Sequence, residues 1–90
     1  SVIRLSFPPL TEERRKEFVK ECRAYAEESR VAVRNARRDA NTAVEKAVKN
    51  DGLPEDEQRR AEAEIQKLTD AAIAKIDAQL AKKEEELMSI

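Results

Sequence analysis

The sequence predicts an all-α chain: a long antiparallel helical hairpin belonging to a three-helix bundle, preceded by a short extended segment. Three observations predict it. Apolar residues recur at steps of three and four over two long stretches, and no proline or glycine interrupts residues 11–50. A single glycine-containing turn separates the stretches. At 41% charged and 40% hydrophobic, the 90 residues suit long helices with narrow apolar seams rather than an ordinary globular core.

The chain begins with an extended segment. Apolar and polar residues alternate from Ile3 to Phe7, which predicts a short β-strand. Pro8 and Pro9 then end any strand pairing and keep the backbone extended. Because a lone strand is not stable, we expect this one to pair with a sheet formed by residues outside these 90.

The first helix is expected from Thr11 to Asn50. Thr11 is suited to an N-cap, and Glu12 and Glu13 follow where the helix dipole favours negative charge. Small and apolar residues along this stretch form a predicted seam that is rich in alanine. Its members are Phe18, Cys22, Tyr25, Ser29, Ala32 or Val33, Ala36, Ala40, Ala43 or Val44, and Ala47.

A turn and a second helix follow. Gly52, after Asn50 and Asp51, is expected to supply a left-handed C-cap, and Pro54 is expected at the first position of the next helix. The second seam comprises Ala61, Ile65, Leu68, Ala72, Ile76, Leu80 and Leu87. A short link makes the helices antiparallel neighbours. Two helices leave half of each seam exposed, so a missing first helix, another protein or a second copy is needed to complete the core.

Charges on the first helix divide between two further faces when residues are placed at about 100° per step. One face is acidic, with Glu17, Glu21, Glu28 and Asp39. The other is an arginine stripe that comprises Lys16, Arg23, Arg30, Arg34, Arg37 and Asn41, with Arg38 at its edge and Glu27 as the one acid within it.

The arginine stripe favours an anionic partner, and RNA in particular. A guanidinium group donates to two phosphate oxygens at once and stacks on bases, which lysine cannot do. The alternative is a solvated charged face in which Glu27 pairs with Arg23 or Arg30. Four arginines between positions 30 and 38, against one adjacent aspartate at position 39, favour the RNA interpretation.

Several classes of function are not expected. The chain has no histidine, one cysteine and no glycine-rich loop, so zinc sites, histidine-based catalysis and phosphate-binding loops lack their residues. Cys22 is interpreted as a small core residue, and Glu84 to Glu86 as a solvated charge run. We expect no enzyme, no cofactor, no metal and no membrane span.

Three segments resemble ribosome recycling factors. They are PPLTEERRKEF at 8–18, ESRVAVRNARRDAN at 28–41 and QKLTDAAIAKIDAQLAKKEEELMSI at 66–90. The resemblance is to the C-terminal half of that family and implies a three-helix bundle with a β domain inserted between its first two helices. Residues 1–10 would then be the last strand of the β domain plus a hinge at Pro8 and Pro9. Residues 11–90 would be helices two and three, with helix one absent from this chain.

The resemblance also implies a function. Members of this family bind large-subunit ribosomal RNA in the cytoplasm after translation termination, and they split the ribosomal subunits together with elongation factor G and GTP. Arg15, Arg34 and Arg37 match the family's RNA-contacting arginines. With the arginine stripe, the predicted RNA-binding set is Arg15, Arg30, Arg34, Arg37, Arg38 and Asn41. DNA is not an expected partner. The alternative is a coiled-coil-like oligomerisation module without an RNA role.

Overall fold

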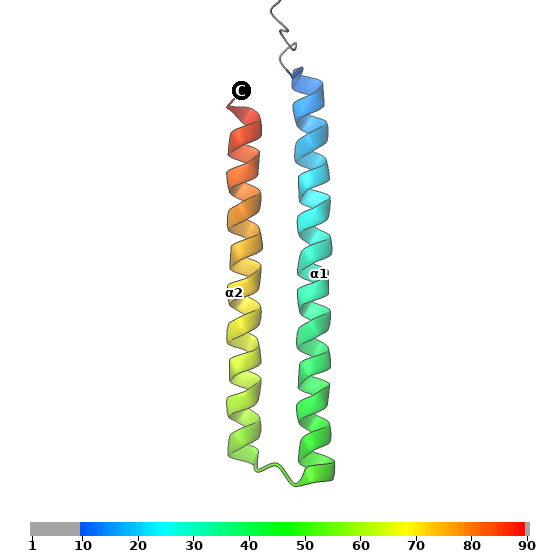
Figure 1. Cartoon of the computed structure of the whole chain (residues 1–90), viewed down its shortest axis with the longest axis vertical. Coiled ribbons are helices and arrows are strands. Elements are labelled where there is room, and N and C mark those ends of the chain that lie inside the picture. Colours follow the sequence, from blue (N-terminus) through cyan, green and yellow to red (C-terminus); the bar gives the residue numbers. More distant parts are fainter. Residues whose placement is uncertain (1–9, 90) are drawn as a thin grey trace, which may run out of the picture.

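The computed structural model describes residues 10–89, which form two long antiparallel helices joined by a short link (Figure 1). Helix α1 spans Glu12–Asp51 (40 residues), and α2 spans Glu55–Met88 (34 residues). The all-α class and the helical hairpin are therefore confirmed. The strand predicted at Ile3–Phe7 and the hinge predicted at Pro8 and Pro9 lie outside the described residues.

Both ends of α1 are capped as their residues predict. The Thr11 hydroxyl oxygen accepts a hydrogen bond from the backbone N–H of Arg14 at 3.1 Å. At the other end, Gly52 has a φ of 68°, in the left-handed region that side chains other than glycine disfavour. The backbone N–H groups of Gly52 and Leu53 both donate to the carbonyl of Ala47. These local contacts fix where α1 begins and ends.

Helix α2 begins one residue later than predicted. Pro54 is its N-cap, with a ψ of 150°, rather than its first helical residue. The fixed φ of proline suits either position, and the extended ψ places Pro54 outside the helix. Its carbonyl accepts from the N–H of Gln58 at 3.0 Å, and three acidic residues follow in the first turn, where they favour the helix dipole.

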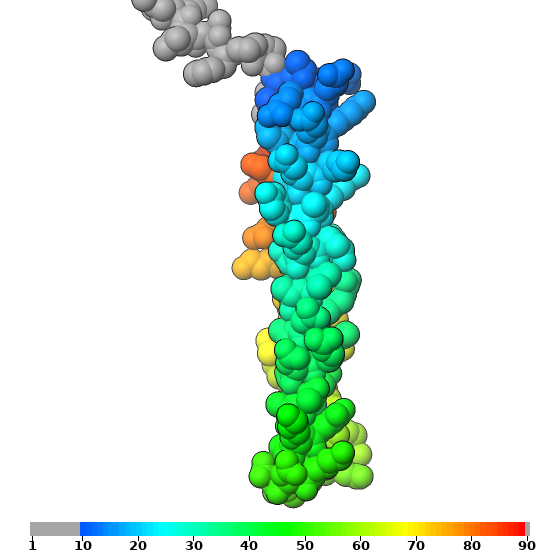
Figure 2. All heavy atoms as spheres, turned by 90° about the vertical axis from the view of Figure 1, so that its right-hand side faces the viewer, coloured from blue at the N-terminus to red at the C-terminus, as the bar shows by residue number. Residues whose placement is uncertain are grey.

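The interface between the helices is narrow. Seen edge-on, α1 covers most of α2, so the hairpin is a single helix thick (Figure 2). Within residues 10–89 only Ala26 and Thr69 are buried, at 8% and 5% exposed. Tyr25 and Leu68, by contrast, are 66% and 62% exposed. A hairpin of this kind has two open broad faces and an incomplete core.

Neither of the two described helices has a stretch that is long and apolar enough to cross a membrane.

Candidate nucleic-acid interface

Helix α2 packs on the part of α1 that lies between the predicted seam and the arginine stripe. On the predicted seam, Tyr25, Ser29 and Ala36 are exposed. On the arginine stripe, Arg30 and Arg37 are instead half-buried. Other seam residues are half-buried, namely Phe18, Cys22, Val33, Ala40, Val44 and Ala47. The seam prediction therefore holds in part, with α2 offset from the centre of the seam toward the arginine stripe. A physical reason is that alanines offer little area, whereas arginine stems carry methylene groups that α2 can cover.

This offset leaves an apolar groove on one broad face of the hairpin. The groove consists of two open hollows between the helices, of about 350 and 320 Å³. The first lies between Tyr25 on α1 and Ile76 and Leu80 on α2. The second lies between Val33 and Leu68. Exposed apolar side chains along these two hollows indicate an interaction surface.

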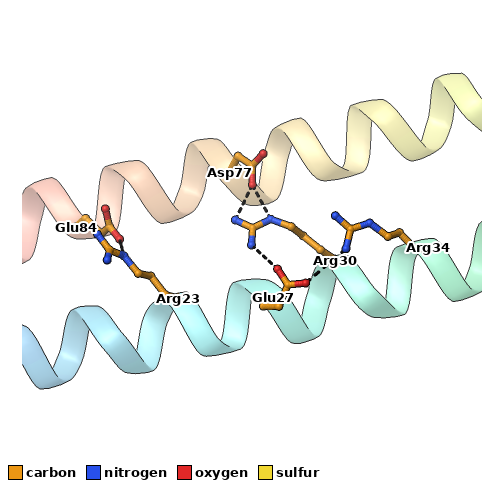
Figure 3. A network of polar contacts seen from close by, with 6 residues as sticks. All are labelled: Arg23, Glu27, Arg30, Arg34, Asp77 and Glu84. Atoms are coloured by element: carbon orange, nitrogen blue, oxygen red, sulfur yellow. Dashed lines mark hydrogen bonds and ion pairs between the residues drawn. The ribbon is translucent and has the colours of Figure 1, made fainter.

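Arg30 is the centre of the opposite, charged edge (Figure 3). Its Nε and Nη2 atoms both lie 2.8 Å from Oδ1 of Asp77 on α2, and its Nη1 lies 3.0 Å from Oε2 of Glu27. The side chain is only 19% exposed. The hydrogen bond to Asp77, and then that to Glu27, raise the pKa of Arg30 above its ordinary value, while desolvation opposes them. All three guanidinium nitrogens are thus engaged within the chain.

A second pair joins the helices one heptad away. Nε of Arg23 donates to Oε1 of Glu84 at 2.6 Å, and this hydrogen bond raises the pKa of Arg23. The pairing of Arg23 with Glu27, one of the two expected for a solvated face, was wrong, because Arg23 pairs with Glu84. The other expected pairing, of Arg30 with Glu27, is confirmed. A step of seven along α1 is matched by a step of seven back along α2, as antiparallel packing requires.

Three arginines of the set keep donors available. Arg34 reaches Glu27 only through Nη1, at 3.4 Å, and its side chain is 47% exposed. Arg38 lies 3.8 Å from Asp39 and is 71% exposed. Arg37 borders the second hollow of the groove and has no ion pair among residues 10–89. These three guanidinium groups lie within five consecutive positions of α1.

Asp70 is the acid that antiparallel spacing would pair with Arg37. It stands one heptad before Asp77, just as Arg37 stands one heptad after Arg30. Asp70 instead accepts a hydrogen bond from the side-chain amide of Gln66 at 2.8 Å. The series of interhelical ion pairs therefore stops before Arg37, among the described residues.

Arg15 and Asn41 lie at the margins of this region. Both are half-buried, and the Nε of Arg15 and the Oδ1 of Asn41 are buried without a hydrogen-bond partner within residues 10–89. Arg14, next to Arg15, pairs with Glu17 at 2.7 Å and lies 4.8 Å from the ring centre of Phe18. Arg15 is about 28 Å from Arg34 along the helix, at ~1.5 Å per residue.

Metal binding has no support in the described part of the chain, where no three His, Cys, Asp or Glu side chains are grouped to hold an ion. Cys22 is half-buried beside the first hollow of the groove. The surface therefore offers charge, hydrogen bonding and apolar area.

The interpretation of Glu84 as part of a solvated charge run was wrong, because Glu84 is half-buried and pairs with Arg23 across the helix interface. Asp77, the partner of Arg30, was not predicted as a site residue. Both lie on α2 and determine which arginines are engaged within the chain. The matched heptad spacing of Arg23 and Arg30 with Glu84 and Asp77 is visible in the sequence once the turn at Gly52 is placed. That spacing could have predicted the two interhelical ion pairs.

Comparisons with known proteins assign the chain to a family. Residues 1–88 match the family described as Ribosome recycling factor. The chain is 55% identical over 89 residues to a ribosome-recycling factor of Parabacteroides distasonis, 54% to one of Oleidesulfovibrio alaskensis and 55% to one of Bacteroides fragilis. Each alignment covers 99% of this chain. The chain belongs to the ribosome recycling factor family.

The chain spans about half the length of these curated relatives: the alignments cover 48%, 48% and 47% of them.

Proposed function

We propose that this chain takes part in recycling the ribosome after translation termination, by binding RNA of the large ribosomal subunit through Arg34, Arg37 and Arg38. Family membership over residues 1–88 is the observation that carries the proposal. The relatives are named for ribosome recycling. Such a role takes place on ribosomes in the cytoplasm and requires no catalytic residue in this chain.

The distribution of ion pairs supports the choice of these three arginines. Their guanidinium groups are unpaired or held only by contacts of 3.4 and 3.8 Å within residues 10–89, so they keep donors for phosphate oxygens. Arg15, Arg30 and Asn41 complete the predicted set. Of these, Arg30 has its donors engaged with Glu27 and Asp77, so we assign it a smaller share of the binding.

The groove supports a proposal about domain organisation. We expect a third helix, from the half of the protein that these 90 residues do not include, to cover Tyr25 and Leu68 and complete a three-helix bundle. Residues 11–90 then supply helices two and three, and residues 1–10 supply the last strand of an inserted β domain plus the hinge. Covering exposed apolar side chains contributes about 1.5–3 kcal/mol for each large one that becomes fully buried.

The mechanical part of the proposal involves elongation factor G. A bundle bound to the large subunit carries force from that GTPase to the contacts between the subunits, and the energy comes from hydrolysis by the partner. The long, uninterrupted helices suit this role, because α1 has no proline or glycine between Glu12 and Asp51 that could bend it.

Co-sedimentation with purified large ribosomal subunits over a salt series tests the RNA contact. We expect salt-sensitive binding that Arg34→Ala/Arg37→Ala weakens by about tenfold or more, with a salt slope smaller by about one to two. Arg59→Ala/Arg60→Ala is the matched control, because it removes two exposed arginines from α2. Equal losses in both double variants would mean that the chain binds through overall charge and that the proposed face is wrong.

A second candidate function is an oligomerisation module, which the apolar groove favours. In that case two copies cover each other's grooves, and the arginines contact acidic protein surfaces. Light scattering distinguishes the two: a stable multimer that has no affinity for large subunits at low salt would favour the oligomerisation module.

A further inference from the structure

Two carboxylates connect the interhelical contact to the proposed RNA-binding arginines (Figure 3). Glu27 accepts from Arg30 through Oε2 at 3.0 Å and from Arg34 through Oε1 at 3.4 Å. Arg30 in turn is held by Asp77 across the helix interface. The four side chains form one continuous network that begins on α2 and ends at Arg34 on the exposed face of α1.

The two arginines of the network are held to different extents. Arg30 is 19% exposed and is bonded through all three nitrogens, so its position is fixed. Arg34 is 47% exposed and is bonded through Nη1 alone. Its Nε and Nη2 atoms have no acceptor among residues 10–89. One edge of the Arg34 guanidinium is therefore held, and the other can donate to a ligand.

Glu27 also separates two like charges. Arg30 and Arg34 are four residues apart on one helix, a spacing at which like charges repel each other. A carboxylate that gives one oxygen to each arginine offsets this repulsion and restricts the rotamers of Arg34. A side chain that is already ordered loses less conformational entropy when it binds.

We infer that Glu27 and Asp77 are positioning residues for anion binding: Asp77 fixes Arg30, Arg30 fixes Glu27, and Glu27 orients Arg34 toward an RNA phosphate. The inference rests on the proposed function and deepens it. It assigns a role in RNA binding to two acidic residues, which simple electrostatics would treat as unfavourable beside an RNA-binding face.

Whether RNA binding becomes weaker or tighter when these carboxylates are neutralised tests the inference. Glu27→Gln and Asp77→Asn each remove one negative charge with little change in shape, and Glu28→Gln removes one from the neighbouring position, where the side chain is exposed. If only net charge matters, all three variants bind large ribosomal subunits more tightly. We expect Glu27→Gln and Asp77→Asn to bind about threefold more weakly than the unchanged chain, as coupling within a side-chain network implies. Glu28→Gln should bind no more weakly.

Nitrogen-15 NMR of the arginine side chains gives a measurement that needs no RNA. We expect restricted rotation of the Arg34 guanidinium in the unchanged chain and in Glu28→Gln, and rotational averaging in Glu27→Gln and Asp77→Asn. Circular dichroism checks that all variants keep their helices. An Arg34 guanidinium that is equally mobile in all four chains would overturn the inference, and so would tighter RNA binding by Glu27→Gln.

The two measurements separate this inference from the function on which it rests. If the unchanged chain does not bind large subunits, the proposed function fails, and the NMR comparison still decides whether Glu27 and Asp77 position Arg34. If the chain binds and Asp77→Asn behaves as Glu28→Gln does in both measurements, the RNA contact stands and the positioning role is wrong.

Discussion

At the scale of single residues, identical side chains have different roles because of their neighbours. Arg23 and Arg30 join the two helices through Glu84 and Asp77, whereas Arg38 is 71% exposed and only weakly paired. A raised pKa for Arg30 means that the charged form is favoured in the folded chain. That contribution is present at every pH below the ordinary arginine pKa and is lost only as the pH rises through the raised value, so it does not vary near neutrality.

The turn between the helices depends on one residue. We expect Gly52→Ala to lower the free energy of unfolding by about 1 kcal/mol, because Gly52 has a φ of 68° that alanine disfavours. A new Cβ would meet nothing within 4 Å, so the cost is conformational and not steric. Urea unfolding followed by circular dichroism measures it. Asp51→Ala at the preceding, helical position is the control; an equal loss there would contradict the explanation.

At the scale of elements, the two sides of the helix interface differ in character. The face of α1 between the predicted seam and the arginine stripe packs on α2, which leaves one side for the apolar groove and the other for ion pairs. Because α1 and α2 bury only Ala26 and Thr69 among the described residues, we expect the proposed third helix to contribute much of their stability by covering the groove.

The groove predicts a site of association. We expect Leu68→Asp to weaken binding to the part of the Parabacteroides distasonis relative that the alignment does not cover, by about tenfold, since Leu68 is 62% exposed and borders the second hollow. Val31→Asp is the matched control, because Val31 is also an exposed apolar residue, at 45%, but does not line the groove. Isothermal calorimetry measures both; similar losses would place the association elsewhere.

At the scale of the whole molecule, the hairpin is long, one helix thick and open on both broad faces (Figures 1 and 2). Such a shape presents a large surface for its mass and has no enclosed core. The proposed recycling activity requires a rigid body on which elongation factor G can act. The 90 residues span about half the length of the relatives that are named ribosome-recycling factors.

We therefore expect the 90-residue chain to bind large subunits without splitting ribosomes. In a subunit-splitting assay with elongation factor G and GTP, followed by light scattering, its rate should stay at the background level. A complete ribosome-recycling factor from Bacteroides fragilis serves as the positive control. Splitting at the control's rate by the 90 residues alone would show that the hairpin suffices and that no further helix or β domain is needed.

The sequence by itself determined the two helices, the capping residues of α1 and the family. Thr11, Gly52 and the uninterrupted stretch between them act through contacts within a few residues, so local rules locate α1 closely. Only the tertiary structure decided which side of α1 meets α2 and therefore that Arg30 pairs with Asp77 while Arg34 stays exposed. An alanine-rich seam bordered by long arginine stems allows several rotations of one helix against the other. Contacts between residues far apart in the chain select one of them.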